Sequence, residues 1–442
     1  MGFHPDNLIR GMIGLVFLLG VCYLFSSNRR AIPWRLVGYG VLAQVALGIG
    51  VLTEGRFNYF RKFLEFCSNA FVKLLSLSHA GTDFLFSSLA DSSKSWGYIF
   101  AIQVLPNIVF FAALSAVLYY LGILQKLVHV FAWMLSKLKI TGPESVSTAA
   151  NIFLGQTEAP LMIRPFLEKM NRSEILCIMI GGMANTAGSV LGAYIGMLGV
   201  ADVVLQKYFA LHLLSQALMS APAAIVCSKM LFPQAKDYQV DTRVEVPKQK
   251  LGDNFLDALS IGITDGLKLA VNVGAMLLAF IALMKVLNYL FFKVGDLAGI
   301  NDDIVALNPR LYEGADIRPE DKGLTLQFIL GYIFSPVAWL IGVDRSDMVQ
   351  VGQLLGIKTI MNEFVAFQQF SGIKSTMNSK SVLITTYVLS GFANFASIGI
   401  QIGGISQLAP NQRKNLTELG LKALLGGTIA CLMCGCVAGA LA

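Results

Sequence analysis

The chain has 442 residues, of which 55% are hydrophobic and 14% charged, and its mean hydropathy is +0.64. An average soluble domain has about 25% charged residues, so most of this chain is predicted to lie in lipid. The net charge of +7 does not indicate nucleic-acid binding, because no basic cluster is long enough, and we assign the basic residues to cytoplasmic loops.

The cysteines and histidines do not indicate a metal enzyme. The seven cysteines lack the spacing of a secreted disulfide framework. Cys431, Cys434 and Cys436 lie in a stretch of small residues that is typical of a packed membrane helix. The four histidines are scattered, and no two of them have the spacing of metal ligands.

The first apolar stretch, residues 8–25, is followed by Arg29, Arg30 and Arg35. A signal peptide carries its charges before the apolar run and ends at a small-residue cleavage site, so we expect a retained transmembrane helix. The arginines place the end of this helix in the cytoplasm and the N-terminus outside. A second span is expected at residues 36–52.

In residues 54–77, basic side chains interleave with phenylalanine and leucine, which is typical of an amphipathic helix at the membrane interface. Two polar stretches, 233–254 and 301–323, are predicted to be an extramembrane connection and an acidic loop. About 20 apolar residues are needed to span a bilayer. Six further stretches meet this condition: residues 98–121, 175–197, 208–230, 261–291, 381–402 and 421–442.

Two more apolar segments are interrupted. Residues 147–167 have a polar middle at 155–160, and residues 324–343 are split by Ser335 and Pro336. Their arms are too short to span a bilayer, so each segment is predicted to be a re-entrant helical hairpin. Irregular backbone at membrane depth is tolerated only where it is buried in protein or lines a cavity.

The motif G-x-A-N-x-A occurs twice, at residues 182–187 and 391–396. Each copy follows a broken segment and a glutamate, Glu158 or Glu363. In membrane proteins, paired interrupted segments in two related halves indicate a transporter's binding site near the midplane. We therefore predict an internal repeat whose two asparagines, Asn185 and Asn394, face one cavity.

A carboxylate in the bilayer core is costly, and its default interpretation is functional. Glu158 and Glu363 have two possible roles. They either cap or staple a helix end, or pair with a buried basic residue such as Arg164 or Lys358, or they accept hydrogen bonds from a polar, neutral solute. Nearby amides and hydroxyls favour the solute. A phosphate or a strongly anionic solute would need a dense arginine cluster, which is missing.

Two other residue sets leave alternatives open. Val190 and Phe392 either supply an apolar face for a ring or simply pack. Asn151, Asn185 and the backbone near Leu154 suit a sodium ion, because broken helices offer free carbonyls beside side-chain oxygens. Asn185 and Thr186 are equally compatible with an interhelical hydrogen-bonded pair.

Four stretches closely resemble the concentrative nucleoside transporter family: GQTEAP, GYIFSPVAWLIGV, MNEFVAF and GFANFASIGIQIGG. The resemblance extends from about Gly81 to the C-terminus and is closest to a bacterial-type member, without the additional N-terminal helices of animal relatives. It implies an all-α polytopic membrane protein with eight transmembrane helices, two re-entrant hairpins and an inverted internal repeat. It also implies a homotrimer that works by an elevator-type movement.

The resemblance assigns roles to matching positions. Gln156, Thr157 and Glu158 contact the nucleobase, and Glu363, Asn394 and Ser397 hold the ribose hydroxyls. Val190 and Phe392 pack against the nucleoside. Sodium is held by Asn151, Asn185 and the carbonyls of Leu154 and Thr186. The family usually has serine or threonine where Asn185 stands, and the longer amide alters the geometry of the ion site.

The resulting prediction is a sodium-coupled nucleoside symporter that imports uridine, cytidine and adenosine-type nucleosides across the cell membrane. Proton coupling through Glu158 or Glu363 is the alternative. A channel and an intramembrane enzyme are remote, and an enzyme would need a nucleophile or metal beside the glutamates. We divide the chain into an N-terminal, largely scaffold part (1–140), a first repeat half (141–232), a connecting part (233–323) and a second repeat half (324–442).

Overall fold

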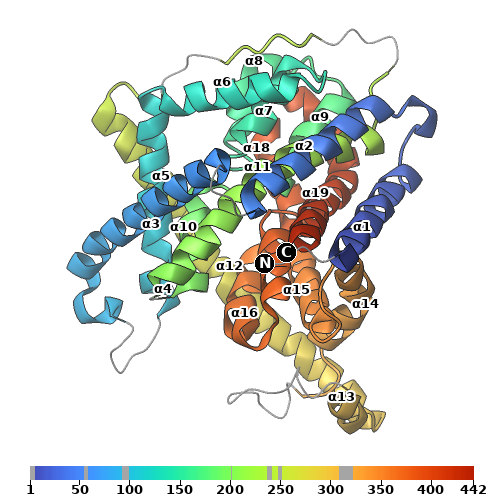
Figure 1. The fold of residues 1–442 in the computed structure, drawn as a ribbon. Helices are drawn as coiled ribbons and strands as arrows, with labels where there is room; N and C mark the ends of the chain where they lie inside the picture. Colours follow the sequence, from blue (N-terminus) through green and yellow to red (C-terminus); the bar gives the residue numbers. More distant parts are fainter. Residues whose placement is uncertain are drawn as a thin grey trace.

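The computed structural model describes residues 5–53, 58–91, 99–200, 202–235, 241–246, 251–307 and 322–442, and the regular elements among them are all helical (Figure 1). Seven helical stretches in these ranges are long and apolar enough to cross a membrane. They are Asp6–Leu24, Trp34–Leu52, Phe100–Tyr120, Arg172–Gly199, Val203–Leu231, Phe255–Leu297 and Pro410–Leu441. The eighth predicted span, at residues 381–402, lies on two shorter helices with an interruption between them, α17 (Ser379–Leu389) and α18 (Phe395–Leu408).

The N-terminal helices pack around the rest of the chain. Helices α1 (Pro5–Leu24) and α2 (Trp34–Leu52) both lie against the C-terminal helix α19 (Arg413–Leu441). Residues 54–57 of the predicted interfacial helix lie outside the described residues, as does residue 98, where a span was predicted to begin. The rest of that interfacial helix is α3 (Tyr59–Phe86), which is longer than predicted and packs against α11 (Val203–Leu231).

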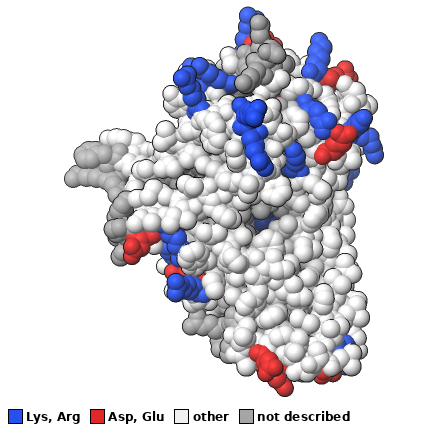
Figure 2. Space-filling model, turned by 90° about the vertical axis from the view of Figure 1, so that its right-hand side faces the viewer, with Lys and Arg blue, Asp and Glu red and all other residues white. Residues whose placement is uncertain are grey.

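Charged side chains are unevenly distributed on the face shown in Figure 2. Lysine and arginine gather at the upper end, and a broad uncharged surface lies below them. The loop that joins α1 to α2 reaches this upper end in Figure 1. The orientation predicted from the arginines of that loop, with this end in the cytoplasm, stays a prediction.

Helices α5 (Leu105–Tyr120) and α12 (Phe255–Leu297) form a closely packed pair. A Cβ atom added at Gly262 would lie 2.6 Å from the Cβ atom of Ala116, and one added at Gly266 would lie 2.8 Å from that of Ala112. Small residues spaced four apart let membrane helices approach this closely, so the pair is held by van der Waals packing of backbone against backbone.

The first repeat half runs through six helices after α6 (Ile123–Ser136). They are α7 (Gly142–Ala150), η3 (Ala159–Ile163), α8 (Arg164–Leu167), α9 (Arg172–Ala184), α10 (Gly188–Gly199) and α11. Residues 151–158 interrupt the first hairpin, which comprises α7, η3 and α8. Residues 185–187 interrupt the span formed by α9 and α10.

The second half repeats this order of elements. It consists of α14 (Leu326–Leu340), α15 (Met348–Ile360), α16 (Glu363–Ile373), α17, α18 and α19. Helices α15 and α16 pack against each other as the second hairpin, and the span formed by α17 and α18 is interrupted at residues 390–394. The half closes with a helix of 29 residues, the same length as α11 in the first half.

The second hairpin is not broken where the sequence suggested. Helix α14 is continuous through Ser335 and Pro336, and the break lies at Met361 and Asn362 instead. Proline has no N–H for the carbonyl of Tyr332, four residues earlier, but the Ser335 hydroxyl donates to that carbonyl at 3.1 Å. The helix therefore tolerates the proline. The predicted acidic loop also differs, because it begins with helix α13 (Asn301–Leu307); residues 308–321 lie outside the described residues.

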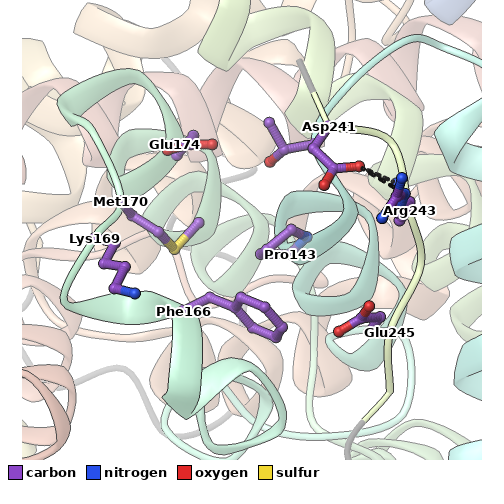
Figure 3. A pocket seen from close by; sticks show the side chains of 9 residues that line it. Pro143, Phe166, Lys169, Met170, Glu174, Asp241, Arg243 and Glu245 are labelled. Carbon is purple, nitrogen blue, oxygen red and sulfur yellow. Dashed lines mark hydrogen bonds and ion pairs between the residues drawn. The ribbon is translucent and has the colours of Figure 1, made fainter. Parts of the chain in front are cut away.

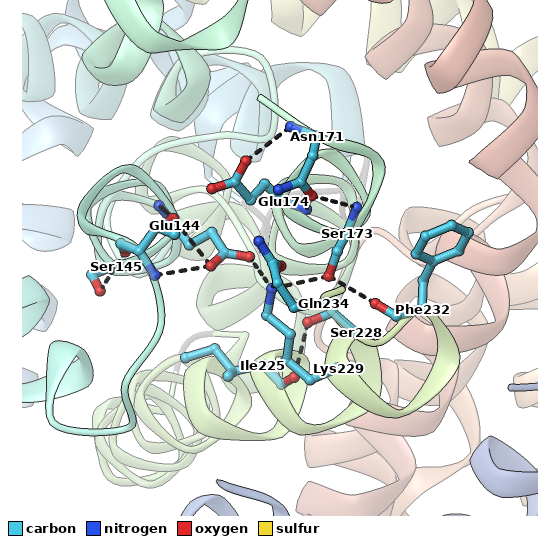
Figure 4. Close-up of polar contacts among 11 residues, drawn as sticks. Glu144, Ser145, Asn171, Ser173, Glu174, Ile225, Ser228, Lys229, Phe232 and Gln234 are labelled. Carbon is cyan, nitrogen blue, oxygen red and sulfur yellow. Dashed lines mark hydrogen bonds and ion pairs between the residues drawn. The ribbon is translucent and has the colours of Figure 1, made fainter. Parts of the chain in front are cut away.

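A buried polar cluster fixes the base of the first hairpin (Figure 4). Thr141 and Glu144 form a capping box at the start of α7. The Glu144 carboxylate is also ion-paired with Lys229 near the end of α11, and both side chains are buried. The Lys229 ammonium donates to the Ser173 hydroxyl at 3.1 Å, so α7, α9 and α11 are tied together at one point.

The segment 241–246 of the connecting stretch lies across this base. The Gly142 N–H donates to the carbonyl of Asp241 at 2.8 Å, and a Cβ atom at Gly142 would lie 1.7 Å from the carbonyl oxygen of Arg243. Beside it lies a pocket of about 210 Å³ that carries charges of both signs (Figure 3). The pocket is lined by Thr141, Pro143, Phe166, Lys169, Met170, Glu174, Asp241, Arg243 and Glu245.

Candidate functional site

The two copies of the repeated motif meet at the interruptions of their helices. The Phe392 N–H donates to the carbonyl of Asn185 at 3.3 Å, and the hydroxyls of Thr186 and Ser390 are 3.0 Å apart. Gly391 has a φ of 150°, and a Cβ atom there would lie 2.9 Å from the carbonyl oxygen of Ala184. The repeat therefore brings its two breaks into direct contact.

The tip of the first hairpin packs against α18. The Gln156 amide donates to the Ser397 hydroxyl at 3.2 Å and accepts from the Gln401 amide at 3.1 Å. Thr157 lies against Gly404, because a Cβ atom added at Gly404 would be 2.8 Å from the methyl carbon of Thr157. Gly182 leaves room for this tip, since a Cβ atom there would lie 2.9 Å from the Gln156 Cβ atom.

Glu363 lies at the break of the second hairpin. Its backbone starts α16, which Asn362 caps by accepting from the Val365 N–H at 2.9 Å. The positive end of the helix dipole favours a carboxylate at this position. One carboxylate oxygen accepts from the Asn394 amide at 2.9 Å, and the other accepts from the Tyr194 hydroxyl at 3.1 Å.

These contacts form one chain of hydrogen bonds between the two hairpins. Asn394 also caps α18 by accepting from the Ser397 N–H at 2.9 Å, so Gln156, Ser397, Asn394 and Glu363 are linked in sequence. All four side chains are buried. The structure thus brings together four of the eight residues predicted to contact substrate.

The other four residues predicted to contact substrate are not part of these hydrogen bonds. Thr157 and the exposed Glu158 follow Gln156 at the hairpin tip, and the Glu158 carboxylate accepts from the Gly155 N–H at 3.2 Å. Val190 is buried in the first turn of α10. Phe392 is half-buried in the second break, where its side chain packs on the core.

Neither glutamate forms an ion pair with the basic residues that the sequence suggested as partners. The Lys358 ammonium donates to the carbonyl of Val388 at 2.7 Å, at the C-terminal end of α17 where the helix dipole favours a cation. Among the described residues, Glu158 and Glu363 form no ion pair with Lys358 or Arg164. The ion-pair form of the structural alternative therefore has no support. Its other form, in which each glutamate caps or staples a helix end, remains open, because Glu158 accepts from the Gly155 N–H and Glu363 lies at the start of α16.

The residues predicted to hold sodium border both breaks of the first half. Asn151 ends α7, and its amide nitrogen donates to the carbonyl of Ser147 at 3.0 Å. Its side-chain oxygen has no partner in the described part of the chain, and neither does the Ser147 hydroxyl beside it. Buried oxygens normally have partners, so this unpartnered group fits a bound cation.

The backbone adds two more oxygens. The N–H groups of Glu158 and Ala159 both bond to the carbonyl of Gly155, and those of Val190 and Leu191 both bond to that of Ala187. The carbonyls of Leu154 and Thr186, one residue earlier in each case, accept no backbone hydrogen bond within the described residues. They are therefore available as ligands for a cation.

Asn185 is the least direct of the predicted ligands. Its side-chain oxygen accepts from the Ser220 hydroxyl at 2.8 Å, and its amide nitrogen has no partner among the described residues. Rotation of the amide by about 180° exchanges the two atoms, and the Ser220 hydroxyl can accept as well as donate. The rotated amide frees its oxygen for a cation.

Sequence reasoning missed Tyr194, Ser220 and Gln401, which contact the predicted site residues directly. All three are polar groups within apolar helices. Polar side chains inside membrane helices are uncommon and usually have a partner or a function. Their polarity in these apolar stretches was therefore the signal that could have identified the three residues.

Comparisons with known proteins agree with this architecture. Three family descriptions match the chain: "Na+ dependent nucleoside transporter N-terminus" at residues 13–89, "Nucleoside recognition" at 101–201 and "Na+ dependent nucleoside transporter C-terminus" at 212–439. An uncharacterized transporter of Haemophilus influenzae is 38% identical over 98% of this chain and 97% of its own length. Sodium/nucleoside cotransporter 1 of Rattus norvegicus is 35% identical over 99% of this chain, which covers 64% of the rat protein.

Solved structures extend the similarity to three dimensions. CNTnw in an inward-facing, substrate-bound state superimposes with a TM-score of 0.86 at 36% identity, over 98% of both chains. A CNTnw variant in an outward-facing state also gives a TM-score of 0.86. These matches define a multi-pass transporter of the cell membrane rather than an enzyme. The chain belongs to the concentrative, Na+-dependent nucleoside transporter family.

Proposed function

We propose that this protein is a sodium-coupled symporter that imports nucleosides of the uridine, cytidine and adenosine type. The observation that carries the proposal is the hydrogen-bonded chain from Gln156 through Ser397 and Asn394 to Glu363. It joins both hairpins through amides, a hydroxyl and a carboxylate, which are suitable partners for a solute rich in OH and NH groups.

In this proposal, the hairpin tip at Gln156, Thr157 and Glu158 would contact the nucleobase. Glu363, Asn394 and Ser397 would hold the ribose hydroxyls. Val190 and Phe392 would supply the apolar contacts of the nucleoside. A ligand placed there touches the interruptions of both repeat halves, which is where transporters built from repeats bind their substrates.

The coupling ion would be held by the side chains of Asn151 and Asn185 and the carbonyls of Leu154 and Thr186. Sodium bound there supplies a positive charge that orders residues 151–158, the same loop that presents Gln156 to Glu158. Substrate and ion would then each stabilise the bound state of the other, as linkage requires of any coupled pair.

The movement that carries substrate across the membrane would be of the elevator type, in a homotrimer. Support comes from the similarity to CNTnw chains in inward-facing, outward-facing and intermediate states, with TM-scores from 0.83 to 0.86. Helices α5 and α12, locked together by their small residues, would belong to the part that stays fixed.

The first experiment is uptake of radiolabelled uridine and adenosine into proteoliposomes, driven by an imposed sodium gradient or an imposed proton gradient. We expect accumulation with sodium. Accumulation with protons alone would retain the nucleosides and reject the sodium site, so that Glu158 and Glu363 become the candidates for coupling. No uptake of either nucleoside by folded protein would reject the proposed function.

The ion site is tested by Asn151→Ala and Asn185→Ala. Each variant removes an oxygen ligand, so we expect uridine uptake to lose most of its dependence on sodium concentration. The measurement is initial uptake as a function of sodium at fixed uridine. A sodium dependence equal to that of the wild type in both variants would contradict the assignment.

A further inference from the structure

Glu363 is held by a residue from the opposite repeat half. Its carboxylate accepts from the Tyr194 hydroxyl at 3.1 Å and from the Asn394 amide at 2.9 Å. Asn394 belongs to the second half, as Glu363 does, but Tyr194 lies on α10 in the first half. Among the described residues, Tyr194 is therefore the residue of the first half that bonds this carboxylate.

The ring of Tyr194 has little freedom to move. It is fully buried, stacked on Phe367 with ring centroids 4.4 Å apart, and it meets Phe364 edge-on at 4.9 Å. Both phenylalanines lie on α16, the helix that Glu363 begins. The phenol is thus packed against the same helix whose first residue it bonds, which fixes the position of its hydroxyl.

The two hydrogen bonds leave the carboxylate with capacity for a ligand. An ionised carboxylate has about four acceptor positions, and Tyr194 and Asn394 use one on each oxygen. The backbone N–H of Glu363 also bonds to this carboxylate, so at least one position remains for a ribose hydroxyl. A donor on both oxygens also prevents rotation of the carboxylate about its last bond, so the free positions keep one direction.

We infer that Tyr194 is a positioning residue that orients Glu363 toward the ribose hydroxyls of the substrate. The inference rests on the proposed function, because it assumes that Glu363 binds ribose. Tyr194 itself does not need to touch the nucleoside. Its helix begins at Gly188, whose N–H bonds to the carbonyl of Phe153 in the first hairpin at 3.1 Å, so it also connects ribose recognition to the predicted ion-binding loop.

The test compares two substrates in the variant Tyr194→Phe, which keeps the ring packing and removes the hydroxyl. Uridine presents the 2′ and 3′ hydroxyls, and 2′,3′-dideoxyuridine lacks both. The Tyr194 hydroxyl bonds to a charged group, and such hydrogen bonds are among the stronger ones in proteins. We therefore expect kcat/KM for uridine to fall about tenfold when the hydroxyl is removed. The value for dideoxyuridine should change less than about twofold, because that substrate lacks the 2′ and 3′ hydroxyls from which Glu363 is proposed to accept.

Tyr387→Phe is the matched control. Tyr387 is also a buried tyrosine, but its hydroxyl lies 3.3 Å from the imidazole Nδ1 of His212, away from Glu363. We expect this variant to leave the ratio of kcat/KM for uridine to kcat/KM for dideoxyuridine unchanged. If Tyr194→Phe does not fold, a fluorinated tyrosine at position 194 changes the acidity of the phenol while nearly preserving its shape, and the ratio should again shift.

The outcomes are distinguishable. An equal loss for both substrates in Tyr194→Phe, or an unchanged ratio in the phenylalanine or fluorotyrosine variants, would overturn the role of Tyr194. Failure of the wild-type protein to take up uridine would instead overturn the proposed function on which the inference rests.

Discussion

At the scale of single residues, amide orientation decides what the site offers to a ligand. The Gln401 amide nitrogen donates to the backbone carbonyl of Met179 at 3.0 Å, and a carbonyl can only accept. The same nitrogen donates to the side-chain oxygen of Gln156 at 3.1 Å. Gln156 must therefore turn its own N–H₂ group toward Ser397, so a residue outside the predicted site fixes the orientation of one inside it.

Gln401→Leu removes this constraint while retaining most of the side-chain volume. We expect the KM for uridine to rise about three- to tenfold, because the freed Gln156 amide must be ordered again on binding, and a neutral hydrogen bond contributes about 1 kcal/mol. Gln44→Leu is the control, since Gln44 is a fully buried glutamine that donates to the Cys434 sulfur far along the sequence from the site. A similar KM in both variants would contradict the role of Gln401.

At the scale of elements, the base of the first hairpin depends on one buried ion pair. Lys229 and Glu144 are both buried, and removing one partner leaves the other charged and unpaired (Figure 4). We expect Lys229→Met to destabilise the protein by about 3–5 kcal/mol, because an unpaired buried charge is costly. The measurement is the Tm of the purified protein in detergent.

Two further variants separate charge from packing. The double variant Lys229→Met with Glu144→Gln removes both charges and should recover part of the lost Tm. Arg243→Met removes an exposed partner of Asp241, 4.0 Å away at the same end of the molecule, and should change Tm little (Figure 3). A double variant less stable than Lys229→Met alone would show that the pair does not act through its charges.

The elements also show which local signals in the sequence were sufficient. Long apolar stretches predicted the spans because length and hydropathy are properties of the segment itself. Pro336 misled, because the Ser335 hydroxyl satisfies the carbonyl that the proline leaves free. The true break at Met361 and Asn362 carries neither proline nor glycine, and its one local signal is the capping side chain of Asn362.

At the scale of the whole molecule, the repeated motif was predictable but its contacts were not. Matching letters identified the two asparagines, but the structure places them differently, because Asn185 ends α9 and Asn394 begins α18. That the breaks touch depends on how α9, α11, α17 and α19 pack, which no single segment encodes. The same limit applies to Tyr194 and Gln401, whose partners lie more than 150 positions away in the sequence.

The glycines of the two motifs therefore serve different contacts. Gly182 makes room for Gln156 and Gln401, whose amide nitrogen would lie 2.7 Å from a Cβ atom at that position. Gly391 lies where the two halves meet, with a φ of 150° that side chains rarely adopt. A Cβ atom at Gly391 would lie 2.6 Å from the Cys431 sulfur and 2.9 Å from the carbonyl oxygen of Ala184.

Gly391→Ala should consequently destabilise the whole protein, by about 2–4 kcal/mol from backbone strain and overpacking together. Gly399→Ala is the control a few residues along, because a Cβ atom at Gly399 meets no atom within 4 Å and its helix favours alanine. We expect the Tm to fall in Gly391→Ala and to stay level or rise in Gly399→Ala. Uridine uptake should fall in the first variant and be retained in the second. Equal stability of the two variants would mean that the contact between the breaks does not hold the halves together.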